Sequence, residues 1–330
     1  MPRNPFYDPG KPHHKPDGFR NPPGSPPGHR LTRELAREAA HFLGELLRLR
    51  TAPHPFDDQH VVAEPQVLDA LRTQTAARHV TWMGHACFLL HLNGRWVLTD
   101  PYLSDYAAPL PTPATRRLIP PAIATSRIPQ VDLILLSHNH YDHMDREALK
   151  ILAQRFPEAR IVVPLGLKAI LQRWGFRHVH EHDWWDKIRV AGLEVTLVPA
   201  VHTSKRGIGD TNRTLWCGFA FRDGDWQGYF AGDTAYGEVF KVIGERVGPF
   251  DLGLVPIGAY APRRLMHPVH CTPEDAVQIG VDIGARQVIG MHWGTIRLTT
   301  EPLDEPRQRF LAVDSPLPRS VMRIGEVRAL

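Results

Sequence analysis

Four potential metal ligands lie close together, in the loop that follows an apolar run at residues 131–136. They are His138, His140, Asp142 and His143, in the order HxHxDH. Imidazole and carboxylate are preferred ligands of zinc and similar divalent ions, and loops at strand ends are where such sites sit. The spacing lets the first two share one metal while the last two serve a second. The motif therefore predicts metal binding rather than a solvated histidine-rich loop.

Two metal ions need more ligands than one loop supplies, and three further residues follow apolar runs in the same way. They are His202, Asp233 and His292. Small neighbours such as Gly232 permit close approach of the chain. A carboxylate such as Asp233 can bridge two ions about 3.5–4 Å apart, the separation that two-metal hydrolysis uses. Each residue alone could be an ordinary hydrogen-bonded loop residue, but together with the HxHxDH run they predict a dinuclear centre.

The elements that must position these residues alternate between strand and helix patterns. Residues 79–99 predict strands that are broken at 84–85 and at the turn formed by Asn93 and Gly94. The run at 131–136 predicts a buried strand, and a helix should run from about 145 to 156. Further strands are predicted at 160–163, 178–181, 194–199, 214–222, 227–231, 252–256 and 286–291, and helices at 166–173, 236–246, 273–283 and 304–312. This mixture predicts a layered α/β architecture.

The first fifty residues differ in composition from the rest. Residues 1–30 hold nine prolines and four glycines, which favours a disordered or loosely wrapped arm. Residues 31–50 predict an amphipathic helix. We expect its apolar face to pack on the domain, with a membrane-surface helix as the alternative. Residues 51–330 are expected to form a single hydrolase domain.

Composition excludes several classes of protein. The net charge is +4, but residues 1–30 hold five Lys/Arg and two Asp/Glu, so the remaining chain is almost neutral. A nucleic-acid partner is therefore not expected. No apolar run approaches the roughly 20 residues of a membrane span, and no signal peptide is recognisable. Three scattered cysteines fit a reducing compartment. We expect a cytoplasmic protein with possible peripheral membrane contact, and the oligomeric state stays open.

The HxHxDH run, a distant histidine, an aspartate after a strand and a last histidine resemble the metallo-β-lactamase superfamily. Other stretches, in the same order along the chain, resemble its family of N-acyl-phosphatidylethanolamine-hydrolysing phospholipases D. They are residues 82–86, 99–101, 137–145, 163–167, 183–185, 231–234, 248–252, 256–260 and 292–295. The resemblance covers roughly residues 80–297, and residues 19–22 also resemble the start of that family.

This resemblance implies an αββα sandwich that holds two zinc ions, although iron or manganese accept similar ligands. One ion would have three histidine ligands, the other would have three mixed ligands, and a carboxylate would bridge them: His138, His140 and His202; Asp142, His143 and His292; and Asp233. His270 matches a further active-site histidine, but its neighbours Cys271 and Thr272 depart from the family pattern.

The implied activity is that of a phospholipase D-type phosphodiesterase. It would hydrolyse N-acyl-phosphatidylethanolamine-like lipids to N-acylethanolamine and phosphatidic acid, with a hydroxide that bridges the metals as nucleophile. Asp142 would orient the nucleophile, and His270 would donate a proton or hydrogen bond, unless it only caps the next helix. One alternative is a lactonase or soluble small-molecule phosphodiesterase with the same metals. The other is a non-catalytic metal-binding protein.

Five residues are candidates for places around the ligands. Asp100 could orient a ligand histidine, although it could also be a simple turn residue. His85 and Tyr141 could contact the ligands or the substrate, and Tyr260 and Trp293 could line a pocket.

Overall fold

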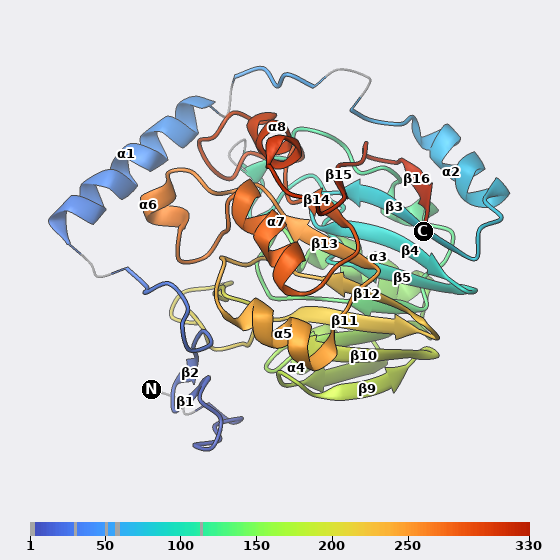
Figure 1. Ribbon diagram of the computed structural model, residues 1–330, viewed down its shortest axis with the longest axis horizontal. Helices are drawn as coiled ribbons and strands as arrows, with labels where there is room; N and C mark the ends of the chain where they lie inside the picture. The colour runs from blue at the N-terminus through green and yellow to red at the C-terminus, as the bar shows by residue number, and fades with distance from the viewer. Residues whose placement is uncertain (1–3, 30–31, 50–51, 57–59, 113–114) are drawn as a thin grey trace.

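Two seven-stranded sheets face each other in the computed structural model, which describes residues 4–29, 32–49, 52–56, 60–112 and 115–330 (Figure 1). The first sheet has the order β16-β3-β4-β5-β6-β7-β8, and the second has the order β15-β14-β13-β12-β11-β10-β9. Helices cover the outer faces. The architecture is the αββα sandwich that the resemblance implies.

Each sheet is built from one continuous stretch of the chain, except that the C-terminal strand β16 returns to the first sheet. The first sheet contains β3 (Arg78–Gly84), β4 (Cys87–Leu92), β5 (Arg95–Thr99), β6 (Leu133–Leu135), β7 (Arg160–Pro164), β8 (His178–His182) and the C-terminal β16 (Val327–Ala329). The second contains β9 (Lys187–Val190), β10 (Leu193–Val198), β11 (Gly218–Asp223), β12 (Trp226–Phe230), β13 (Leu252–Pro256), β14 (Val288–Met291) and β15 (Arg319–Ser320).

The helices pack on both sides of this sandwich. Beside the first sheet lie α2 (Glu64–Thr73), α3 (Arg146–Arg155), α4 (Lys168–Arg173) and the 3₁₀ turn η2 (Thr125–Arg127). Over the second sheet lie α5 (Val239–Val247), α7 (Pro273–Asp282) and α8 (Glu305–Ala312), with α7 against β13 and β14. The short α6 (Arg263–Met266) lies between β13 and α7 in sequence.

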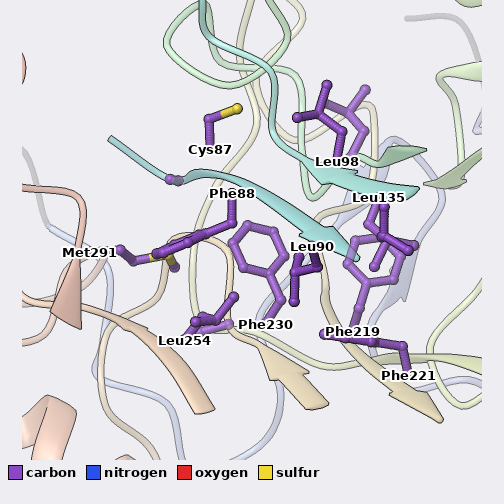
Figure 2. Close-up of a cluster of buried hydrophobic side chains, with 14 of the residues drawn as sticks. Cys87, Phe88, Leu90, Leu98, Leu135, Phe219, Phe221, Phe230, Leu254 and Met291 are labelled. Atoms are coloured by element: carbon purple, nitrogen blue, oxygen red, sulfur yellow. The ribbon is translucent and has the colours of Figure 1, made fainter. Parts of the chain in front are cut away.

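Apolar side chains from the two inner faces fill the space between the sheets (Figure 2). Phe88 and Leu90 of β4 lie opposite Phe219, Phe230 and Leu254 of the second sheet, and all five are fully buried. Each such side chain contributes about 1.5–3 kcal/mol by leaving water. The core therefore gives the strand ends a stiff platform.

Strand direction explains why the predicted site residues can meet. Strands β5 to β8 run parallel to one another, and so do β12 to β15. Strand β3 is parallel to β5 because the antiparallel strand β4 lies between them, and β10 is parallel to β12 because the antiparallel strand β11 lies between them. The segments after β3, β5, β6, β10, β12 and β14 therefore leave the sheets on the same side of the sandwich. Ligands typically bind outside the carboxyl ends of strands in such sheets.

The sequence-predicted elements between residues 79 and 312 correspond to observed ones, with a few differences. The strand predicted at 214–222 begins only at Gly218, because Leu215 and Cys217 donate their backbone N–H groups to Leu165 and Ser137 in loops of the first sheet. Helix α7 begins after the N-cap Thr272, whose side chain forms a capping box with Asp275. Strands β9, β15 and β16 and helices α2 and α6 were not predicted. The three cysteines are free and buried.

The expectation of a disordered arm is wrong for residues 4–29, which we call the N-terminal segment. It contains the two short strands β1 (His14–Lys15) and β2 (Gly18–Phe19). The side chains of Asn4, His14 and Phe19 are buried. Specific contacts with the sandwich, described below, hold it despite its proline content. The division of the chain near residue 50 stays a prediction.

Helix α1 (Arg33–Leu49) forms as predicted, but the expectation that its apolar face packs on the domain is wrong for much of that face. Leu46 is buried, whereas Leu43 and Leu47 are 53% and 54% exposed. The helix lies beside α6, where Arg264 pairs with Glu34 at 2.7 Å, and it stands away from the sheets (Figure 1). No helix among the described residues is long and apolar enough to cross a membrane.

Candidate metal centre

The loop of the HxHxDH run is anchored at both of its ends. Before it, Leu136 N donates to Val162 O and extends the pairing of β6 with β7. After it, Asp145 caps α3 by accepting from the N–H groups of Glu147 and Ala148. The loop that carries the candidate ligands is thus fixed by a central strand at its start and by a capped helix at its end.

Three histidines converge on one side of the loop. His140 Nδ1 lies 2.9 Å from His138 Nε2 and 3.2 Å from His202 Nε2. Nitrogens bound about 2.0–2.1 Å from one tetrahedral ion would be about 3.3 Å apart. The three rings therefore have the spacing of ligands to a single ion.

A second group lies next to the first. Ligand atoms of Asp142, His143, His292 and His85 all lie within 4.8 Å of one another. Asp142 Oδ2 is 3.0 Å from His85 Nε2, 3.5 Å from His143 Nε2 and 3.6 Å from His292 Nε2. This group contains the three mixed residues of the expected second set, together with one more histidine.

Asp233 stands between the two groups. Its Oδ1 lies 3.1 Å from His292 Nε2, and its Oδ2 lies 3.1 Å from His143 Nε2 and 3.7 Å from His202 Nε2. A Cβ at the preceding Gly232 would come within 2.6 Å of Ser137 Cβ, so only glycine lets the two loops approach so closely. One carboxylate therefore faces both groups.

Several polar atoms at this point are buried without a hydrogen-bond partner. They include His143 Nε2, His292 Nε2 and Asp233 Oδ1, although each lies near an opposite charge. Buried polar atoms are costly unless something satisfies them, and a cation at their common focus would do so. The residues present thus fit a pair of divalent ions.

Hydrogen bonds behind the rings direct their free nitrogens to that focus. Asp100 Oδ2 accepts from Ser137 Oγ at 2.5 Å and from His143 Nδ1 at 2.7 Å. Ser137 Oγ in turn lies 2.8 Å from His138 Nδ1. Since the Ser137 hydroxyl donates to Asp100, His138 Nδ1 donates to Ser137, which leaves both Nε2 atoms as acceptors. Asp100 thus takes the orienting place expected for it, and Ser137, which sequence reasoning did not single out, extends it.

The carboxylates of Asp142 and Asp233 make a positive charge strongly favourable among the histidines of the second group. Burial alone would raise the pKa of Asp233, but His143 and His292 hold it well below the usual range. Burial opposes protonation of His292, yet Asp233 and Asp142 raise its pKa to about 9. In the first group burial lowers the pKa of His138 and His202 well below the usual value, so those rings are neutral and ready to donate lone pairs.

His85 and His292 join the two sheets through their backbones. Both have positive φ (55° and 62°), which non-glycine residues adopt at a cost that the surroundings must offset. His292 N donates to His85 O, and Thr295 Oγ1 accepts from His85 N. Burial lowers the pKa of His85 to about 3, so its neutral ring bonds to Asp142.

His270 and Tyr141 lie at the rim of the centre. The His270 ring is 5.2 Å from that of His202 and 5.5 Å from that of His292. Burial lowers the pKa of His270 to about 4. Tyr141 donates its hydroxyl to Arg206 O, and the Arg206 guanidinium lies 4.0 Å above its ring.

Tyr260 and Trp293 are placed differently from the other candidates. The Tyr260 hydroxyl donates to Glu305 of α8 at 2.7 Å. Trp293 stacks on Trp82 of β3, with ring centroids 5.6 Å apart. These two contacts run to α8 and β3. Trp293 also borders two cavities, one shared with His292 and one shared with Phe56 and His60. A pocket role for the two rings stays a prediction.

Comparison with known proteins agrees with this geometry. The sequence profile of the β-lactamase superfamily domain matches residues 95–293, which is more than half of the chain. The chain belongs to the metallo-β-lactamase superfamily. The match covers the HxHxDH loop, His202, Asp233 and His292.

Named relatives sharpen the family resemblance. The chain is 39% identical to N-acyl-phosphatidylethanolamine-hydrolyzing phospholipase D 1 of Caenorhabditis elegans, over 70% of this chain and 68% of that protein. A Mycobacterium tuberculosis protein of uncharacterised function is 41% identical over 72% of this chain. The alignment spans 64% of that relative's length. A Koribacter versatilis protein named a metal-dependent hydrolase is 28% identical over 67% of this chain and 86% of its own length.

Solved structures agree on the fold. Isothiocyanate hydrolase from Delia radicum gut bacteria superposes with a TM-score of 0.60 at 22% identity, over 76% of this chain and 99% of that one. The metallo hydrolase Igni18 of Ignicoccus hospitalis gives a TM-score of 0.56 at 22% identity, over 76% and 97%. At these identities the likeness concerns architecture alone.

Proposed function

We propose that this protein is a dinuclear zinc hydrolase, a phosphodiesterase of the phospholipase D type. It would cleave N-acyl-phosphatidylethanolamine-like lipids to N-acylethanolamine and phosphatidic acid. The observation that carries the proposal is the shared carboxylate Asp233, which faces the three-histidine group and the mixed group at once. The relative from Caenorhabditis elegans with that name supports the choice of substrate.

The proposed ligands are His138, His140 and His202 for one ion and Asp142, His143 and His292 for the other, with Asp233 between them. Two divalent ions at these positions would lower the pKa of a water molecule and neutralise charge on phosphate oxygens. Iron or manganese would suit similar ligands, but neutral imidazoles at tetrahedral spacing favour zinc at the first site.

Asp142 and His270 are the proposed catalytic groups of the chain itself, beside Asp233. The Asp142 side chain is 13% exposed, more than Asp233, so it can accept a hydrogen bond from an attacking water. His270 is neutral at pH 7 because burial lowers its pKa, so it would offer a hydrogen bond to a phosphate or leaving oxygen. Capping of α7 is the work of Thr272 instead.

A cavity beside the loop offers room for part of the lipid. It has a volume of about 280 Å³ and includes Tyr106, Tyr141, Trp174 and Arg206 in its lining. Aromatic walls suit an acyl or glycerol portion, and the guanidinium suits a phosphate. Tyr141 is therefore a proposed member of the substrate pocket.

The exposed part of α1 is the proposed contact with a lipid surface. Leu43 and Leu47 project from a helix beside α6, which precedes His270 in the chain. Leu43→Ser together with Leu47→Ser should reduce sedimentation with phosphatidylcholine vesicles, whereas Val281→Thr on α7 should not. Equal sedimentation of all variants would contradict this contact. Point substitutions are preferable to deleting residues 1–50, because that deletion would also remove the docked N-terminal segment and its buried side chains His14 and Phe19.

The main test combines metal counting with a substrate panel. We expect two zinc ions per chain by elemental analysis and release of phosphatidic acid from N-acyl-phosphatidylethanolamine. Asp142→Asn should lower kcat by about 100-fold or more. Asp132→Asn, at the opposite end of β6, serves as the matched control and should retain activity. Turnover of soluble lactones or cyclic phosphodiesters without lipid turnover would contradict the substrate, and absence of any hydrolysis would favour a metal-binding protein.

A further inference from the structure

We propose that Asn21 of the N-terminal segment is a positioning residue for the metal ligand His202. The inference rests on the metal centre proposed above, and it assigns a role to a part of the chain that lies far outside the ligand motifs.

His202 lies on a segment that has left its sheet. Strand β10 ends at Val198, so the backbone N–H of His202 has no partner in the sheet. Asn21 Oδ1 accepts this N–H at 2.9 Å. At the other end of the residue, His202 Nδ1 donates to Val269 O at 2.8 Å. These two bonds fix the backbone and the ring plane, and Nε2 is left to face His140 and Asp233.

The Asn21 oxygen also binds the sandwich core. It accepts a second bond, 3.0 Å long, from the indole Nε1 of Trp216, which is buried. The same indole nitrogen donates to Ala200 O, two residues before His202. One amide oxygen thus ties the segment that carries His202 to a buried aromatic ring.

The N-terminal segment can hold Asn21 firmly because two contacts shortly before it in the chain dock the segment on the sandwich. Asp183 binds Lys11, His13 and His14. Phe19 N donates to Asn212 O at 2.8 Å.

Gly18 approaches Asn212 closely, and Asn212 in turn bonds to the segment that follows the proposed metal ligand His202. A Cβ at Gly18 would lie only 2.3 Å from Asn212 O, so this approach requires glycine. Asn212 in turn exchanges two bonds with the backbone of Ser204, just beyond His202. Both flanks of His202 are therefore supported by the N-terminal segment.

Loss of an outer partner of a metal ligand typically weakens metal affinity about 10- to 100-fold. Asn21→Ala should therefore weaken zinc binding by that factor at one site of two, with little change at the other. Asn21→Asp keeps an acceptor oxygen at the same place, so it should restore affinity to within about threefold of the wild type. The matched control is Arg20→Ala, because Arg20 is exposed and, among the described residues, its side chain bonds only within the segment, to Pro12 O.

Affinity is measured on the full-length chain by competition for zinc with a chromophoric chelator, and the site is identified from the absorption spectrum of the cobalt-loaded protein. Wild-type affinity at both sites in Asn21→Ala would overturn the proposal, and so would equal losses in Asn21→Ala and Arg20→Ala. If Asn21→Ala does not fold, a folded Asn21→Ser with wild-type affinity would overturn it equally. His202→Ala separates the two proposals: if it keeps both ions, the ligand set is wrong, rather than the role of Asn21.

Discussion

Two groups of buried histidines and aspartates in this protein use the same residue types but differ in how their polar atoms are satisfied. In the proposed metal centre, His143 Nε2, His292 Nε2 and Asp233 Oδ1 have no hydrogen-bond partner among the residues that the structure describes. In the second group, which we call the clasp and which consists of Asp183, His13, His14 and Lys11, the carboxylate is saturated.

In the clasp, protein donors satisfy both carboxylate oxygens of Asp183. Asp183 Oδ1 accepts from His13 Nε2 and from Trp184 N, and Oδ2 accepts from Lys11 Nζ and His14 Nε2. A lysine ammonium already occupies the place that a metal cation would take. Proximity of His and Asp therefore does not by itself indicate a metal site. A cluster of such residues whose buried atoms lack protein partners is the better candidate.

The largest expected effect separates the two aspartates. Asp233→Asn should reduce bound zinc below two per chain and lower kcat/KM by about 1,000-fold, or about 4 kcal/mol, because it removes the carboxylate that the two proposed ions would share. Asp183→Asn should leave zinc at two per chain. Elemental analysis and lipid-hydrolysis rates on both variants check this. Equal metal loss in the two would erase the distinction between centre and clasp.

A smaller effect is expected behind the metal centre. Asp100→Asn weakens the support of His143 and, through Ser137, of His138. We expect about 10- to 100-fold weaker zinc binding, which chelator competition measures. Asp132→Asn is again the control. An unchanged affinity would show that the rings are held by packing alone.

Stability, rather than the number of bound zinc ions, should respond most strongly at the clasp. Asp183→Asn should lower the free energy of unfolding by about 2–3 kcal/mol, below the range for a fully buried pair because Lys11 is 40% exposed. Burial alone would raise the pKa of Asp183, but hydrogen bonds from His13 and Lys11 lower it. Its folded pKa thus lies below its unfolded value of about 3.9, so this stabilisation is present above about pH 4 and is lost as pH falls below that. Urea unfolding at several pH values measures the gap, and a gap that widens toward pH 3 would contradict this account.

The smallest effect concerns the lysine. Lys11→Met should cost about 0.5–1 kcal/mol, as expected for a partly exposed ion pair, and should leave the zinc content at two. Chemical denaturation and elemental analysis provide the two readouts. A third tightly bound zinc in Lys11→Met would mean that only the ammonium keeps the clasp from being a metal site.

Most of the fold could be predicted from the sequence, and so could the convergence of the proposed ligands, because both depend on local patterns. Apolar runs predict the strands that precede the ligands, and the ligands follow those strands within a few residues. Asp145 and Thr272 begin their helices through bonds to residues two or three positions away. Such signals span one turn of chain, so a sequence displays them directly.

The predictions for the N-terminal segment and for α1 were wrong because the contacts of these elements involve residues far away in the sequence. The proline content of residues 4–29 argues against helix and central strand, but it is silent about docking on Asp183, about 170 residues away. The apolar periodicity of α1 is real, yet periodicity does not reveal whether a surface is available to cover Leu43 and Leu47.

The sequence by itself determined the residue types of the proposed metal centre: three histidines and an aspartate after a buried strand, and further candidate ligands after later strands. The tertiary structure decided which atoms converge and what orients them. Asn21 and His202 are 181 residues apart, and their bond exists only because the folded N-terminal segment reaches the edge of the sandwich. Local propensity acts over a few residues, whereas a hydrogen bond between distant segments forms only after the core has fixed their positions.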